Sequence, residues 1–431
     1  MQLQDPLDFE IDPATIPDVI TKSNLNRKVS AKLTTPYNVM STFFFRRSIE
    51  KAFQIDEYPS GLSLNLNKSI DAPSPFIILA VDDVVFIVNA MVQKSLSTSQ
   101  KEIFAHVVPT IGRILESDFV GMIQRKMRDE SYPKPLVQGG FPPEDKIISF
   151  IVLINSLEMA NDYLARIIST NLGVNLDLEN SLTKSSPVRG AFPLLQDATF
   201  AAHSLSNLLH SFTTKTTELL NEGLQHLFSN VVRLRLRPVL ADTFRDVDYS
   251  LSEEELAEAA AATAEYDGSG GGGDGDVASE LVPRRFAHGW DQLMRPIGRI
   301  MTPKTFAALL DITAQYLAKQ LEKRVWSSGS GSGSSSSNNS SGVKTRMSAF
   351  GALRMERDLS HIAGVVARGN YAVREVFSRV AQILMVANME EEEWDGVLTG
   401  GEDTGEEEDG GILWVLTEEE RKKARKLVGG G

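Results

Sequence analysis

Side chains that could do chemistry are few in this sequence and lie far apart. Cysteine is absent, which excludes disulfides, thiolate nucleophiles and cysteine-based metal sites. No H-E-x-x-H metal motif occurs around any of the six histidines, His106, His203, His210, His226, His288 and His361. His203 and His210 are seven residues apart, so a helix could place both on one face, but no carboxylate completes a ligand pattern. We therefore interpret the histidines as surface or packing residues and predict no metal site.

Two acidic motifs share only part of the pattern of a metal site. Asp82 and Asp83 are adjacent, whereas a magnesium site on a helix needs carboxylates about one turn apart. The three residues that follow them are apolar, so we place the pair near the N-terminus of a helix, where the macrodipole favours acidic side chains. Asp267, Asp274 and Asp276 lack the ligand ladder and the terminal glutamate of an EF-hand loop.

Phosphate and nucleic-acid chemistry is also unsupported. The glycine-rich residues 270–275 contain no lysine and follow no strand, so they do not form a phosphate-binding loop. Arg233, Arg235 and Arg237 alternate with leucines before Pro238, a local basic patch without interleaved aromatic residues. We interpret these arginines as a solvated face near the end of a helix, and we expect no nucleic-acid partner. Since no catalytic constellation is present, the sequence favours an interaction scaffold over an enzyme, with no cofactor.

The elements that carry these residues are predicted to be helices. Apolar residues recur at steps of three and four in six stretches, 81–96, 103–119, 147–168, 201–236, 286–301 and 350–384. Thr302 and Pro303 predict the N-cap and first residue of a further helix that runs towards Trp326. Strand-like alternation is not evident. The sequence therefore predicts an all-α fold of long helices, packed as antiparallel bundles and stacked into an elongated body.

Charge is distributed unevenly along the 431 residues, whose formal net charge is −13. Residues 251–280 and 390–409 together hold 20 of the 57 acidic side chains and no Lys or Arg. The remaining 37 acidic and 44 basic side chains give the rest of the chain a net charge of +7. Like charges at such density repel one another and stay solvated, so we interpret both acidic segments as loops on a mildly basic helical body.

These composition changes predict the domain organisation. A length of 431 residues suggests about three domains or one elongated assembly of helices. We predict an extended start at 1–26, helical-rod bundles at 27–250, an acidic Gly/Ala-rich linker at 251–285 and a C-terminal helical bundle at 286–428. Low-complexity loops are expected within that last bundle, at 327–345 and 390–411.

Nothing in the sequence predicts a secretory signal or a membrane span. The first residues lack a basic region followed by an apolar stretch, and the best apolar run, 75–90, contains Asp82 and Asp83. Together with the absence of cysteine, this favours a protein on the cytosolic side of membranes.

Several segments, taken in order, resemble subunit four of the conserved oligomeric Golgi complex, a multisubunit tether of the helical-rod type. The similar segments are FFFRRSIEKAFQID at 43–56, VDDVVFIV at 81–88, ESDF at 116–119, KIISFIVLINSLE at 146–158, LAKQLEKRV at 317–325, FGAL at 350–353, VREVFSR at 373–379 and ILWVLT at 412–417. The ordered set, and no single segment, makes the resemblance specific. It extends from about residue 30 to residue 428 and corresponds to the C-terminal half of such a subunit.

The resemblance implies a non-catalytic subunit that tethers vesicles in retrograde transport within the Golgi. Its implied partners are the other subunits of the complex, SNAREs and Rab proteins. Its implied location is the cytosolic face of the Golgi membrane and the cytoplasm, as a peripheral protein without a transmembrane span. The alternative is a subunit of another helical-rod tethering complex, such as an exocyst-type tether at the plasma membrane.

The resemblance also implies one structural ion pair in the final domain. Arg379 matches the arginine of the family's Arg–Glu pair, and Glu420, in LTEEE, matches its glutamate. Arg379 lies between Phe377 and Val380, close to an apolar face, where a charge-assisted pair would join helices. The sequence departs from the family in the length of its segments 327–342 and 390–409, and its ending lacks a basic tail.

Overall fold

The structure, a computed structural model, confirms the predicted all-α class. It describes residues 30–135, 140–173, 186–192, 194–256, 281–329, 346–368, 370–399 and 413–428, with residues 24, 28 and 258. Over these ranges the regular elements are helices, and the only β-type contact is an isolated bridge between Met347 and Val428. The chain divides into two compact units, residues 1–227 with 300–305 and residues 228–299 with 306–431.

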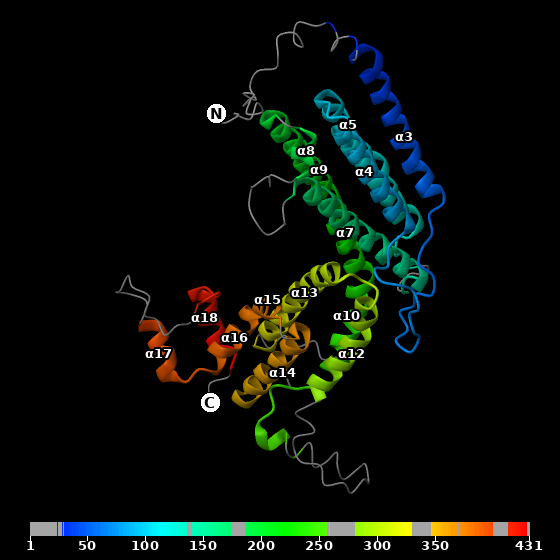
Figure 1. The fold of residues 1–431 in the computed structure, drawn as a ribbon. Helices are drawn as coiled ribbons and strands as arrows, with labels where there is room; N and C mark the ends of the chain where they lie inside the picture. Colours follow the sequence, from blue (N-terminus) through cyan, green and yellow to red (C-terminus); the bar gives the residue numbers. More distant parts are fainter. Residues whose placement is uncertain are drawn as a thin grey trace, which may run out of the picture. The chain divides into compact units, whose positions relative to one another are not determined.

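The first unit is a bundle of long helices packed side by side (Figure 1). Helix α3 packs on α4 and α5, α5 also packs on α9, and α9 packs along α7. The helices are α3 (Thr35–Gln54), α4 (Leu79–Ser97), α5 (Lys101–Ile114), α6 (Gly121–Arg125), α7 (Glu144–Leu172), α8 (Pro187–Ala191) and α9 (Leu195–Leu227). Three π-helical segments complete the unit: Ser30–Thr34 before α3, and Leu115–Val120 and Lys126–Glu130 on either side of α6.

Apolar residues at helical spacing form the buried interior of this unit. Phe119 lies 5.8 Å from Phe53 and 6.1 Å from Phe212, measured between ring centroids, so one aromatic cluster joins α3, the segment after α5, and α9. Aromatic side chains of this size supply much of the burial free energy of a bundle, because each removes a large apolar area from water. Asp82 lies in the first turn of α4, as the sequence predicts.

A fully buried amide fixes a distant segment of the chain to this bundle. Asn155 of α7 donates hydrogen bonds to the carbonyl oxygens of Phe76 at 3.1 Å and Ile300 at 2.8 Å. Its side-chain oxygen accepts from the backbone N–H of Thr302 at 3.1 Å and from the hydroxyl of Thr305 at 3.3 Å. Since a buried amide must satisfy its donors and its acceptor, Asn155 specifies where residues 300–305 attach.

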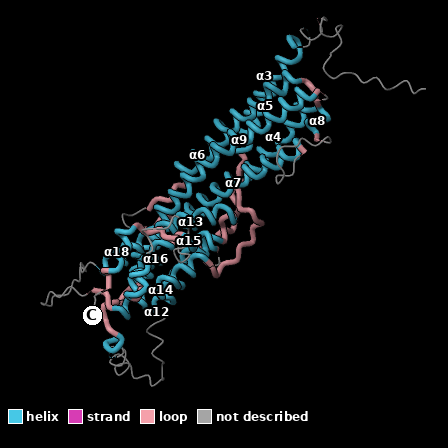
Figure 2. Tube along the Cα trace, turned by 90° about the vertical axis from the view of Figure 1, so that its left-hand side faces the viewer, coloured by secondary structure: helices cyan, strands magenta, loops and turns pink. Residues whose placement is uncertain are grey.

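The second unit contains the helices that follow α9, including the 27-residue α13. Helix α10 packs on α12, α12 on α14, α14 on α16 and α16 on α18, and the tube in Figure 2 shows the dominance of helix throughout. The helices are α10 (Arg233–Thr243), α12 (Leu281–Gly298), α13 (Pro303–Gly329), α14 (Ala349–Ala367), α15 (Tyr371–Glu375), α16 (Ser378–Asn388), α17 (Glu391–Thr399) and α18 (Glu418–Arg425). The π-helical segment Phe228–Val232 connects α9 to α10, and α13 begins in residues that belong to the first unit.

The division into compact units does not follow the predicted domain ranges, which stay a prediction. The sequence places the boundary in the acidic linker at 251–285, whereas the compact units change between Leu227 and Phe228, inside a continuous helical run. Helix α12 also begins at Leu281, before the predicted end of the linker. Composition identifies solvated segments. It does not indicate that the first residues of α13, Pro303–Thr305, belong to the first unit and the rest of this helix to the second. The predicted start at 1–26 and most of the linker lie outside the described residues.

Three local predictions are corrected by the structure. The stretch 350–384 is not one helix: it breaks at Arg368, which has φ +42°, and Asn370 caps the next helix by accepting from the N–H of Ala372. Part of the predicted loop 390–411 is helix α17, whose acidic first turn complements the helix dipole. The arginines before Pro238 do not lie at the C-terminal end of a helix, because α10 begins at Arg233 and continues through this proline to Thr243.

Among the helices that the structure describes, one, α7, is long and apolar enough to cross a membrane by length and composition. Of its most apolar window, 67% is buried inside the bundle. That burial is typical of a core helix, which presents the same length and composition as a membrane span.

Candidate functional site

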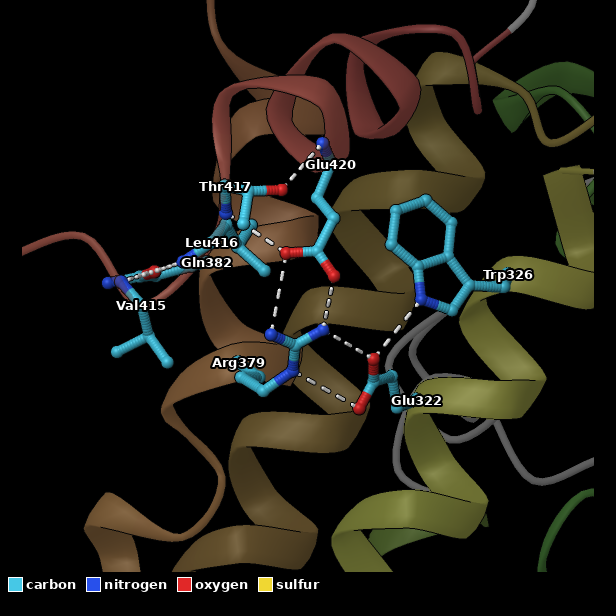
Figure 3. Close-up of polar contacts among 8 residues, drawn as sticks. All are labelled: Glu322, Trp326, Arg379, Gln382, Val415, Leu416, Thr417 and Glu420. Carbon is cyan, nitrogen blue, oxygen red and sulfur yellow. Dashed lines mark hydrogen bonds and ion pairs between the residues drawn. The ribbon is translucent and has the colours of Figure 1, made fainter.

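A cluster of charged side chains joins three helices of the second unit. Arg379, near the start of α16, lies between Glu322 of α13 and Glu420 of α18 (Figure 3). The structure thus brings together the two residues that the sequence resemblance pairs, and it adds Glu322. The sequence signal for Glu322 was its place in LAKQLEKRV, but spacing alone gave no reason to pair it with Arg379.

The arginine contacts both carboxylates with two nitrogens each. Its Nη2 lies 2.8 Å from Glu420 Oε1 and 3.0 Å from Glu322 Oε1, while Nη1 and Nε reach the second oxygens at 3.4 Å. A planar guanidinium suits such forked contacts better than an ammonium group does, because its donors have a fixed geometry. The side chains of Arg379, Glu322 and Glu420 are 35%, 23% and 32% exposed, so the cluster is partly screened by solvent.

Local sequence explains why α18 presents Glu420 to this arginine. Thr417 and Glu420 form a capping box: the Thr417 hydroxyl accepts from the N–H of Glu420, and Glu420 Oε2 accepts from the N–H of Thr417 at 2.9 Å. Acidic residues fill the first turn of α18 and basic residues its last turn, which suits the helix dipole at both ends. Glu420 therefore both begins α18 and joins it to α16.

Neighbouring contacts strengthen the same junction. Gln382 of α16 donates to the carbonyl of Leu413 at 2.7 Å and accepts from the N–H of Val415 at 2.8 Å, which fixes the segment before α18. Trp326 Nε1 donates to Glu322 at 3.4 Å, and Lys423 Nζ lies 4.5 Å from the centre of the Trp326 ring. The result is a polar and aromatic seam that joins α13, α16 and α18.

The electrostatics of the cluster favour a single protonation state. Hydrogen bonds from Arg379 first, and from the Thr417 backbone second, lower the pKa of Glu420 to about 2. Hydrogen bonds to Glu420 and Glu322 raise the pKa of Arg379 above its already high ordinary value. A general acid or base needs a pKa near the working pH, so this cluster is suited to joining helices and not to transferring protons.

A second, buried cluster ties the segment after α10 to α14, and the sequence gave no indication of it. The hydroxyl of Tyr249 donates to Asp358 Oδ2 at 3.0 Å, and the two residues are 6% and 1% exposed. Burial, reinforced by the negative charge of Asp358, raises the pKa of Tyr249, and burial also raises the pKa of Asp358. A Cβ added at Gly351 would lie 1.8 Å from the carbonyl oxygen of Tyr249, so this close approach requires glycine.

The remaining candidates from the sequence stay separate from this site and from each other. His203 and His210 are exposed on α9, and Asp82 and Asp83 project from α4. Among the residues that the structure describes, no group of three or more His, Asp or Glu is arranged to hold a metal ion. The glycine-rich residues 270–275 and the aspartates around them lie outside the described ranges.

Fold and site together define an all-α helical-bundle protein in which an arginine between two carboxylates joins its C-terminal helices. Two family models match the chain: "Conserved oligomeric Golgi complex subunit 4, C-terminal" over residues 150–423 and "COG4 transport protein, middle alpha-helical bundle" over residues 4–127. The chain therefore belongs to the conserved oligomeric Golgi complex subunit 4 family.

Curated relatives of that name extend across eukaryotes. The chain is 24% identical to the subunit 4 of Arabidopsis thaliana over 388 residues, which is 88% of this chain and 43% of that protein. It is 24% identical to that of Saccharomyces cerevisiae, over 66% of this chain and 30% of that protein, and 23% identical to that of Mus musculus, over 82% and 41%. The chain thus spans less than half the length of these relatives. No solved structure matches it significantly.

Proposed function

We propose that this chain is a non-catalytic subunit of the Golgi vesicle-tethering complex and acts in retrograde transport within the Golgi. The observation that carries the proposal is the ordered match of the chain to the middle and C-terminal models of one family. The cluster around Arg379 supports a non-catalytic role. Glu420 stays ionised and Arg379 stays protonated near neutral pH, so neither is suited to transferring a proton.

The partners in this proposal are the other subunits of the complex, SNAREs and Rab proteins. The chain would act as a peripheral protein on the cytosolic face of the Golgi membrane, and also in the cytoplasm. Burial of the most apolar window of α7 supports attachment through other proteins over insertion of this helix into a bilayer.

Within this function, the proposed role of Arg379 and Glu420 is structural. Arg379 holds α13 and α18 against α16 through charge-assisted hydrogen bonds to Glu322 and Glu420. The C-terminal helices would then present one fixed surface to a partner.

The test is affinity purification of the tagged protein from its own cells, followed by quantitative mass spectrometry and imaging. We expect the other Golgi-complex subunits and Golgi SNAREs to co-purify, and the tagged protein to coincide with a Golgi marker. Co-purification with plasma-membrane tether subunits, together with staining at sites of secretion, would establish the exocyst-type alternative. Failure to enrich either set would refute a tethering role.

A further inference from the structure

Helix α3 is apolar on two opposite faces, and in the part of the chain that the structure describes only one of these faces is covered. Phe45, Ile49 and Phe53 face the bundle and are at most 7% exposed. Val39, Met40 and Phe43 are 64%, 70% and 72% exposed. Since successive residues of a helix turn by about 100°, Phe43 and Phe45 are about 200° apart and point to opposite sides.

The exposed residues form one contiguous stripe. Val39, Met40, Phe43 and Phe44 lie at spacings of one, three and four residues, and Leu33 extends the stripe one to two turns towards the N-terminus. Single exposed apolar side chains are ordinary, whereas two phenylalanines, a methionine and a valine on adjacent turns are not. A helix that is apolar on both faces has the pattern of a helix buried between two layers.

Spacing and charge indicate what forms the missing layer. Anchors at three- and four-residue intervals match the ridges of a second helix lying alongside. Over residues 30–54, the charged residues are four basic side chains, Lys32, Arg46, Arg47 and Lys51, and one acidic side chain, Glu50. Arg46 reaches Asp118 at 3.1 Å and Arg47 reaches Glu50 at 2.6 Å, but all four basic side chains remain exposed. A helix docked on the stripe would therefore meet a basic rim.

We propose that the outer face of α3, from Leu33 to Arg47, is a docking surface for an amphipathic helix of another protein with acidic flanks. The docked helix would span about four turns, because these 15 residues rise about 22 Å at 1.5 Å each. Its apolar residues pack against Met40 and Phe43, and its acidic residues lie opposite Arg46 and Arg47. The surface follows from α3 itself and does not depend on the assignment to Golgi transport.

The test measures binding of two synthetic helices to the purified chain by fluorescence anisotropy. Both peptides have about 20 residues and leucines at three- and four-residue spacing; one carries glutamate on its flanks and the other lysine. We expect the glutamate peptide to bind at least about tenfold more tightly than the lysine peptide at about 150 mM salt. Equal affinities, or no binding of the glutamate peptide, would overturn the proposal.

Substitutions locate the binding on α3. The double variant Met40→Ser/Phe43→Ser should weaken the glutamate peptide at least about tenfold, because it removes the central apolar anchors without changing charge. Phe86→Ser is the matched control: Phe86 is 74% exposed on α4, outside the stripe, and its loss should leave the affinity unchanged. All altered side chains are exposed, so the thermal unfolding of each variant should match that of the wild type. An unchanged affinity in the double variant would refute the location.

A photo-reactive phenylalanine at position 43, introduced in cells, distinguishes the possible occupants. Cross-links to an acidic amphipathic helix of another protein are the expected result. Cross-links within the same chain or between two copies would show that the face has a different occupant. Sedimentation with anionic vesicles that is lost in Met40→Ser/Phe43→Ser would likewise replace the proposal with a membrane contact.

Discussion

Removing the charge of Arg379 tests whether the cluster in Figure 3 stabilises the C-terminal helices. We predict that Arg379→Met lowers the free energy of unfolding of the second unit by about 2 kcal/mol, between the small value of exposed pairs and the larger value of buried ones. We expect an intermediate value because the side chains of Arg379, Glu322 and Glu420 are between 23% and 35% exposed. Each of the two carboxylates that loses its arginine accounts for about 1 kcal/mol. Methionine keeps much of the side-chain volume, so the loss reports chiefly on charge.

Urea unfolding followed by tryptophan fluorescence is a suitable assay, because Trp326 and Trp414 lie beside the cluster. Hydrogen exchange of the α18 amides adds a local measurement that does not require the whole chain to unfold in two states. The matched control is Arg128→Met, which removes an exposed arginine paired with Asp129 and should match the wild type. If Arg379→Met is as stable as this control, the pair is solvated and the reasoning is refuted.

The pH dependence provides a second check on the same residues. The pKa of Glu420 is lowered to about 2 in the folded chain from its ordinary value of 4.5, so its contribution is complete above pH 4.5 and is lost as the pH falls towards 2. A third of this side chain is exposed, so solvent screening limits the contribution to about 1 kcal/mol. Glu420→Gln should therefore be less stable than the wild type by a constant amount between about pH 5 and 8, and the difference should shrink below pH 4.5. A difference that grows on acidification would contradict this assignment.

Three further predictions concern the buried contacts. Gly351→Ala should destabilise the second unit by at least about 2 kcal/mol, because its Cβ would overlap the Tyr249 carbonyl, whereas Gly364→Ala, with open space around it, should be neutral or slightly stabilising in the same melts. Asn155→Ala should cost the first unit about 2 to 4 kcal/mol in urea unfolding, since it leaves buried backbone groups unpaired, while the exposed Asn207→Ala should not. Burial raises the pKa of Asp358, so its protonated form stabilises the folded chain at low pH, and this contribution is lost as the pH rises through the folded pKa. Asp358→Asn should remove this decrease when the free energy of unfolding is measured against pH.

The sequence predicted the helices well because their signal is local. The three- and four-residue spacing of apolar side chains is repeated over many turns, and most of these residues are buried where the pattern places them. Thr302 and Pro303 likewise predicted the start of α13, where the Thr302 hydroxyl accepts from the N–H of Thr305. The break at Arg368 was missed because apolar periodicity continues on both sides of it.

Contacts between distant residues were beyond the reach of sequence spacing. Arg379 and Glu420 were paired only through family resemblance, and Glu322 is 57 residues from Arg379 on another helix. The spacing puts Asn155 four residues after Ile151, on the apolar face of α7, but it gave no sign of the partners that this amide binds. The membership of residues 300–305 in the first unit accompanies this residue's contacts, which composition does not reveal.

The attachment of residues 300–305 to the first unit has a consequence for synthesis on the ribosome. Domains usually fold in order as they emerge, with the N-terminal domain completed first. Here Asn155 lacks three of its four partners until Ile300, Thr302 and Thr305 have been translated, more than 70 residues after α9 ends at Leu227. Until then, of these four partners only the Phe76 carbonyl is available to the Asn155 amide, while residues 228–299 of the second unit are made. The interior of the first unit is therefore completed only by residues that are translated after the segment 228–299.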